Sequence, residues 1–111
     1  MAYDEKLAQR IRDLLSDERG VVEKKMFGGL AFLINGNMSV AASGQGGLLV
    51  RVDPDNSDVL VKKPGVESMV MRGRPMAGWL RVDADAVRTK AQLSAWVRRS
   101  VSFARSLPPK R

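Results

Sequence analysis

The sequence contains neither cysteine nor histidine, and these two absences exclude several classes of function. Without cysteine, the chain cannot form a disulfide, an iron–sulfur centre, a zinc finger or a catalytic thiolate. Without histidine, it lacks the commonest general base and the commonest transition-metal ligand. The composition therefore favours a binding or regulatory module over an enzyme. We expect no catalytic residue, no metal and no cofactor.

Aromatic residues are scarce as well, at 5% of the chain, and long apolar runs are missing. No run approaches the roughly 20 residues that a membrane-spanning helix needs. The N-terminus carries neither the positive charge nor the apolar stretch of a signal peptide. With 111 residues, of which 44% are hydrophobic and 28% charged, the chain has the length and composition of one domain over residues 1–111. We expect a cytoplasmic protein without a membrane partner.

Positive charge is concentrated in the second half of the chain. In total 19 Lys and Arg oppose 12 Asp and Glu, which gives a net charge of +7. Residues 1–55 carry −1 and residues 56–111 carry +8. This asymmetry indicates an anionic partner, either an acidic protein surface or nucleic acid, although a solvated helix face gives the same pattern. The basic residues expected to contact this partner are Arg88, Lys90, Arg98, Arg99 and Arg105.

Hydrophobic periodicity predicts a helix near each end of the chain. Apolar residues at helical spacing predict an amphipathic helix over residues 4–15, with Asp4 as its N-cap. A longer helix is expected from about residue 84 to 107, with Asp83 as its N-cap and the two prolines after Leu107 as its stop. Both helices have one apolar face, so both are expected to pack on the same layer.

Between these helices, the sequence predicts an antiparallel meander. Strand-like segments recur between short turns, at residues 21–27, 30–34, 37–42, 48–52 and 79–82. Asn35-Gly36 is typical of a type I′ hairpin turn. Gly73, Pro75 and Gly78 argue against a strand over residues 66–78. The expected fold is therefore α+β with two layers, in which N- and C-terminal helices cover one face of a sheet of four or five strands.

Two polar motifs resemble ligand sites, but structural roles fit them better. Residues 44–47 are glycine-rich, yet they lead into a strand, whereas a phosphate-binding loop leads into a helix. Asp53, Asp55 and Asp58 lie close together, but the glycine and glutamate of a calcium loop are missing from the required positions. We expect a hairpin turn at the first motif. At the second, Asp53 is expected to cap a short helix that ends near Leu60.

Two further features leave a different function open. Gly28 and Gly29 follow Met26 and Phe27, a pattern that favours a tight bend over the core but also allows contact with a ligand. Arg51 interrupts an apolar strand, so its side chain must face solvent, a carboxylate or a ligand anion. The alternative hypothesis is therefore a small-ligand-binding or catalytic domain that uses the Gly28-Gly29 bend and Arg51.

Taken in order, these segments resemble the N-terminal domain of the TfoX (Sxy) family of competence regulators. The residues that carry the resemblance are Lys25-Met26-Phe27-Gly28-Gly29-Leu30, Asn35-Gly36, Leu48-Leu49-Val50-Arg51-Val52-Asp53, Gly73-Arg74-Pro75-Met76 and Trp79-Leu80-Arg81-Val82. The resemblance covers nearly the whole chain. It implies an α–β–α two-layer fold like that of secretion chaperones, a bacterial protein, and no established catalytic residue. Family regulators often carry a second, helical domain after this one.

The sequence and the resemblance together predict a non-enzymatic regulatory or interaction module, related to competence and transcription regulation. Its expected partner is a protein, contacted through the basic residues of the second half. Weak, non-specific binding to nucleic acid is an alternative use of the same residues. A homodimer is also compatible with the sequence.

Overall fold

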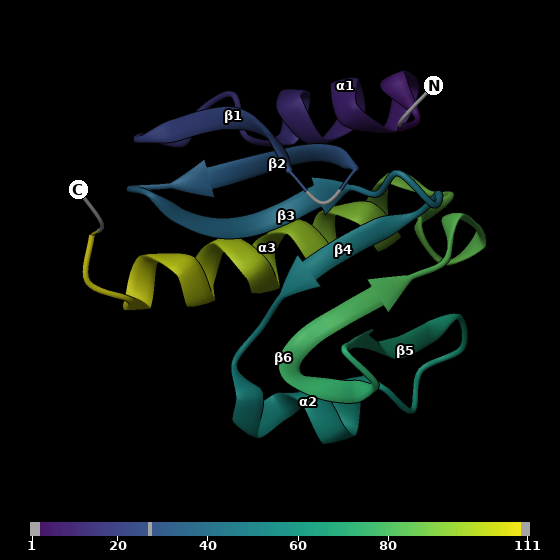
Figure 1. Ribbon diagram of the computed structural model, residues 1–111. Helices are drawn as coiled ribbons and strands as arrows, with labels where there is room; N and C mark the ends of the chain where they lie inside the picture. Colours follow the sequence, from purple (N-terminus) through teal and green to yellow (C-terminus); the bar gives the residue numbers. More distant parts are fainter. Residues whose placement is uncertain (1–2, 27, 110–111) are drawn as a thin grey trace.

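A six-stranded antiparallel sheet forms the centre of the computed structural model, which describes residues 3–26 and 28–109 (Figure 1). The strands are β1 (Val21–Met26), β2 (Gly29–Ile34), β3 (Asn37–Ala42), β4 (Leu48–Arg51), β5 (Val66–Met71) and β6 (Arg74–Val82), in the spatial order β1-β2-β3-β4-β6-β5. The helices are α1 (Glu5–Leu14), α2 (Pro54–Leu60) and α3 (Lys90–Ser106), with a 3-10 turn, η1 (Ala84–Val87), before α3. The predicted α+β class, with an antiparallel sheet and terminal helices, is confirmed.

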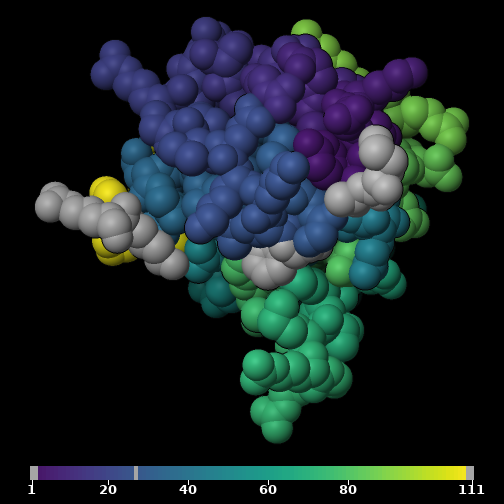
Figure 2. Space-filling view, turned by 45° about the horizontal axis from the view of Figure 1, so that its top comes forward, coloured from purple at the N-terminus to yellow at the C-terminus, as the bar shows by residue number. Residues whose placement is uncertain are grey.

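The sheet has one strand more than expected, because residues 66–78 contribute to a hairpin between β5 and β6. Arg72 and Gly73 both adopt positive φ, at 55° and 77°, as the two central residues of a type I′ turn do. Pro75 is tolerated because β4 pairs with β6 only from Trp79 onward, so no β4 hydrogen bond is lost. The hairpin projects from the body of the molecule (Figure 2).

The two faces of the sheet bury different amounts of apolar surface. The larger core lies between the sheet and the helices α1 and α3, where Phe32 of β2, Ile11 of α1 and Leu93 of α3 are fully buried. The opposite face carries a smaller cluster, formed by Ala31, Met38, Ala41, Leu49 and Met69. Burial of apolar area is the main stabilising contribution to folding, so the helix-covered face holds the fold together.

The last helix begins later than the sequence pattern indicates. Asp83 makes no side-chain capping hydrogen bond, and the residues after it form the 3-10 turn η1. The N-cap of α3 is Thr89, whose Oγ1 accepts from the backbone N–H of Gln92 while the Gln92 side chain accepts from the backbone N–H of Thr89. This reciprocal capping box supplies acceptors for two N–H groups. None of the helices within the described residues is both long and apolar enough to cross a membrane.

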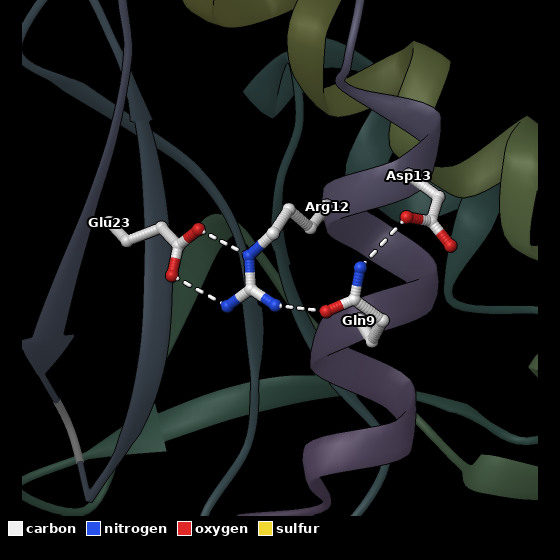
Figure 3. Close-up of polar contacts among 4 residues, drawn as sticks. All are labelled: Gln9, Arg12, Asp13 and Glu23. Atoms are coloured by element: carbon white, nitrogen blue, oxygen red, sulfur yellow. Dashed lines mark hydrogen bonds and ion pairs between the residues drawn. The ribbon is translucent and has the colours of Figure 1, made fainter.

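A network of polar side chains ties α1 to the edge strand β1 (Figure 3). The Arg12 guanidinium donates two hydrogen bonds to the Glu23 carboxylate, at 2.5 and 2.7 Å. Gln9 accepts from Arg12 and donates to Asp13 on the same helix. The hydrogen bond from Arg12 is the main reason that the pKa of Glu23 lies below its ordinary value. The ion pair therefore places charged side chains on β1, the first edge strand of the sheet.

Replacing Glu23 with Gln is expected to lower the melting temperature by a few degrees at most at pH 7, because both side chains are substantially exposed. A carboxyl whose pKa is lower in the folded than in the unfolded chain stabilises the fold above its unfolded pKa of about 4.3. That contribution is lost as the pH falls through the folded pKa. Thermal melts of both proteins should therefore differ at neutral pH and converge in acid. A difference that persists in acid would contradict the assignment.

Candidate functional site: the cleft between α2 and α3

Helices α2 and α3 border a cleft of about 640 Å³. Its apolar lining comes from Val52, Val59, Leu60 and Phe103, and its polar lining from Asp53, Asn56, Arg98, Arg99, Ser102 and Ser106. Val59 is 67% exposed, although valine is an apolar residue. An apolar recess with polar groups around it is the common form of a binding site.

The position of α2 follows from its cap. Asp53 Oδ1 accepts a hydrogen bond from the backbone N–H of Asp55 at 2.9 Å, and Pro54 occupies the first turn. This confirms the predicted capping role of Asp53. Ser57 and Leu60 are buried, so α2 is held against the body while Val59 points outward. The cap thus fixes one wall of the cleft.

Arg51 lies at the end of β4, beside two aromatic rings. Its guanidinium carbon is 5.2 Å from the centre of the Trp79 ring and 5.5 Å from the centre of the Phe103 ring. Trp79 is its cross-strand partner on β6, and Phe103 lines the cleft from α3. Such cation–π contacts orient a guanidinium plane. Among residues 3–26 and 28–109, no carboxylate forms an ion pair with Arg51.

Arg99 and Arg98 place further positive charge at the same cleft. The Arg99 guanidinium carbon lies 4.7 Å from the centre of the Trp96 ring, and Arg98 is exposed. Neither takes part in the ion pairs found among residues 3–26 and 28–109. We call Arg51, Arg98 and Arg99 the arginine cluster. Because none of the three forms an ion pair with a described carboxylate, and Asp53 is the one acidic residue in the lining, the cluster favours an anionic group in or beside the cleft.

The five basic residues selected from the sequence do not form one continuous surface. Arg88 precedes α3 and pairs with Asp85 at 2.6 Å. Arg105 pairs with Glu18 at 2.6 Å. Lys90 lies exposed in the first turn of α3, while Arg98 and Arg99 line the cleft. Two of the five are thus already neutralised within the fold, and two belong to the candidate site.

The Gly28-Gly29 bend and Arg51 lie far apart in the register of the sheet. Gly29 opens β2 and packs against the backbone of Ala42, at the end of the sheet where β4 begins. Arg51 is the last residue of β4 and pairs with Trp79. The structure therefore does not bring these residues together into one site.

The remaining family-motif residues lie outside the cleft. Lys25 is exposed on β1, and Met26 packs against the smaller apolar cluster. Arg74 and Pro75 are exposed at the start of β6, where Met76 is half-buried. The prediction for Phe27 lies outside the described residues. None of these positions lines the cleft.

Sequence reasoning missed most of the cleft lining. Val59 and Phe103 were not selected, nor were Asn56, Ser102 and Ser106. Trp79 was predicted only as part of a strand. The spacing of Trp96, Arg99 and Phe103 on α3 was a usable signal, because residues three and four apart share a helix face. The contact between Arg51 and Trp79 had no local signal, since it depends on the pairing of β4 with β6.

The architecture is that of a small α+β domain with a basic cleft beside its last helix. The chain matches the family model of the TfoX N-terminal domain over residues 13–104. It therefore belongs to the TfoX N-terminal domain family, as the sequence resemblance predicts. The match includes every residue that lines the cleft except Ser106. No curated protein and no solved structure matches the chain.

Proposed function

We propose that this chain is a non-enzymatic regulatory domain of the competence-regulator type, which acts by binding a protein partner in the α2–α3 cleft. The observation that carries the proposal is the arginine cluster beside an apolar recess. Arginine and aromatic side chains are enriched among the residues that contribute most to protein–protein affinity. Family membership is consistent with a regulatory role of this type.

The chemistry of the cleft defines the partner segment. Arg98 and Arg99 line the cleft, and Arg51 contacts the ring of Phe103, which lines it too. The one carboxylate in the lining is that of Asp53, which already accepts from the Asp55 N–H. The fitting segment therefore carries acidic side chains for the cluster and at least one apolar side chain to cover Val59 and Phe103. A net charge of +7 would also speed the encounter with an acidic protein.

Nucleic acid fits these observations less well. Phosphate contacts need exposed cations along a backbone track, whereas Arg88 and Arg105 pair with carboxylates of the chain itself. An apolar recess offers nothing to a phosphate. If duplex DNA does bind, the logarithm of its affinity should fall with the logarithm of salt concentration, with a slope of about −0.9 per phosphate contact. Fluorescence anisotropy with labelled duplex at several salt concentrations measures this slope.

The test is an affinity pull-down from native cell extract, run with and without nuclease, that compares three forms of the protein. The wild type should retain a protein partner after nuclease treatment. Arg98→Glu should weaken that retention about tenfold or more, because it reverses a charge at the cleft. Lys90→Glu makes the same charge change on the same helix outside the cleft, and should retain the partner.

Two results would contradict the proposal. Equal retention by Arg98→Glu and the wild type would place the contact elsewhere on the protein. Loss of all captured protein after nuclease treatment would show that nucleic acid was the tether. Circular dichroism melts of each variant check that exposed substitutions have left the fold intact.

A further inference from the structure

The two edges of the sheet are protected to different degrees. On β1, Glu23 is held by Arg12, and Lys24 and Lys25 are exposed along the strand. Charged side chains, lysine above all, discourage another strand from adding to an edge. On β5, Glu67 is the one charged residue of six. Charged side chains therefore discourage another strand from pairing with β1, whereas the unpaired side of β5 has little such protection.

The β5 edge also exposes adjacent apolar side chains. Val70 is 57% exposed and Met71 is 38% exposed. Only two other large apolar residues of the described chain are exposed to this degree, Val22 and Val59. In the described sheet, β5 pairs with β6 alone. The hairpin that carries β5 projects from the body, so a second chain can approach its edge (Figure 2).

We propose that β5 pairs with β5 of a second copy of this chain, antiparallel and about a two-fold axis at Val70. The pairing joins two six-stranded sheets into one continuous sheet. It goes beyond the proposed function, because no residue of β5 lines the α2–α3 cleft. The interface is isologous, so each copy supplies the same edge.

Charge complementarity selects a second copy as the occupant of this edge. In this register, Glu67 lies opposite the hairpin turn of the other copy, between its Arg72 and Arg74. None of these three side chains forms an ion pair within the described residues. The two Arg72 side chains start about 13 Å apart along the strands, beyond the Debye length of about 8 Å at physiological salt. The arrangement thus pairs opposite charges and separates like charges.

Disulfide trapping tests the pairing cleanly, because the chain contains no cysteine. Residues directly opposite in an antiparallel pair have Cα atoms about 4.5–5.5 Å apart, within the range that a disulfide spans. Full-length Val70→Cys should therefore form a covalent dimer under mild oxidation. The yield, read on a non-reducing gel, should exceed that of the controls several-fold.

Two matched controls distinguish the proposed register from random collision. Val22→Cys places a cysteine on the other edge strand at nearly the same exposure, 59% against 57% for Val70. Glu67→Cys lies on β5 itself, but its two copies would be about 20 Å apart in the proposed pair. Both should remain largely monomeric. Adding Glu67→Arg to Val70→Cys should lower the dimer yield several-fold, and more so at low salt.

Equal cross-linking of Val70→Cys and Val22→Cys would overturn the proposal, as would a Val70→Cys protein that stays monomeric. Preferential cross-linking of Glu67→Cys would overturn the register. These outcomes are independent of the partner pull-down, which depends on Arg98. Val70 is exposed, so its replacement should leave the fold intact, and a circular dichroism melt of the reduced protein verifies this.

Discussion

Replacing Gly29 with alanine is expected to lower the free energy of unfolding by about 3 kcal/mol, measured by urea denaturation. A Cβ at this position would overlap the carbonyl oxygen of Ala42 and press on the backbone N of Gly44. Both are backbone atoms of the neighbouring chain segment, so no rotamer change relieves the overlap. The strands β2 and β3 would have to separate at the point where they begin to pair.

The adjacent Gly28 is the matched control. Its φ of +74° is in the left-handed region, but a Cβ there would meet nothing within 4 Å. Gly28→Ala should therefore cost only the conformational penalty, about 1 kcal/mol. Equal losses in the two variants would show that the close approach of Gly29 to Ala42 costs no more than the left-handed conformation of Gly28.

Phe32→Ala is expected to lower the free energy of unfolding by about 3–5 kcal/mol. Phe32 is fully buried in the larger core, between the sheet and the helices. Removing its ring leaves a cavity that the surrounding side chains cannot fill. Domains of this size have total stabilities of about 5–15 kcal/mol, so the loss is a large share of the whole. Urea denaturation measures this loss, provided that the dependence of the free energy of unfolding on urea concentration is the same in both proteins.

Phe103→Ala makes the same change of residue type at the edge of the cleft, where it removes the ring of Phe103. Phe103 is half-buried and contacts Arg51, so the loss of stability should be clearly smaller than at Phe32. Partner retention in the pull-down should fall instead, because the apolar lining of the cleft is reduced. A Phe103→Ala protein as unstable as Phe32→Ala would indicate that this ring belongs to the core.

Local sequence signals predicted those elements whose geometry depends on neighbouring residues. Asn35-Gly36 forms a turn with φ of 51° and 84°. An Asn-Gly pair is typical of such a turn, so the two residue types predict it. Arg72-Gly73 adopts nearly the same angles, but arginine is uncommon at that position, so the β5–β6 hairpin was missed. The start of α3 was misplaced because Asp83 was the only N-cap expected there, whereas Thr89 and Gln92 form the capping box.

The candidate site was predictable only in part. Arg51 was selected because it interrupts an apolar strand, and Arg98 and Arg99 for their charge, but charge alone did not separate these two from Arg88 and Arg105. What separates them is tertiary: the latter two meet Asp85 and Glu18, and the former meet aromatic rings or solvent. The cleft itself lies between α3 and α2, which packs on β6, and no local pattern encodes this arrangement.

The stacking of arginines on indole rings gives the site an optical reporter of its own. The chain has two tryptophans, and both contact members of the arginine cluster, Trp79 through Arg51 and Trp96 through Arg99. An anion that draws either guanidinium off its ring changes the polarity and charge around that indole. Intrinsic fluorescence therefore follows occupancy of the cleft without any label, and Trp79→Phe and Trp96→Phe assign the signal to one arginine or the other.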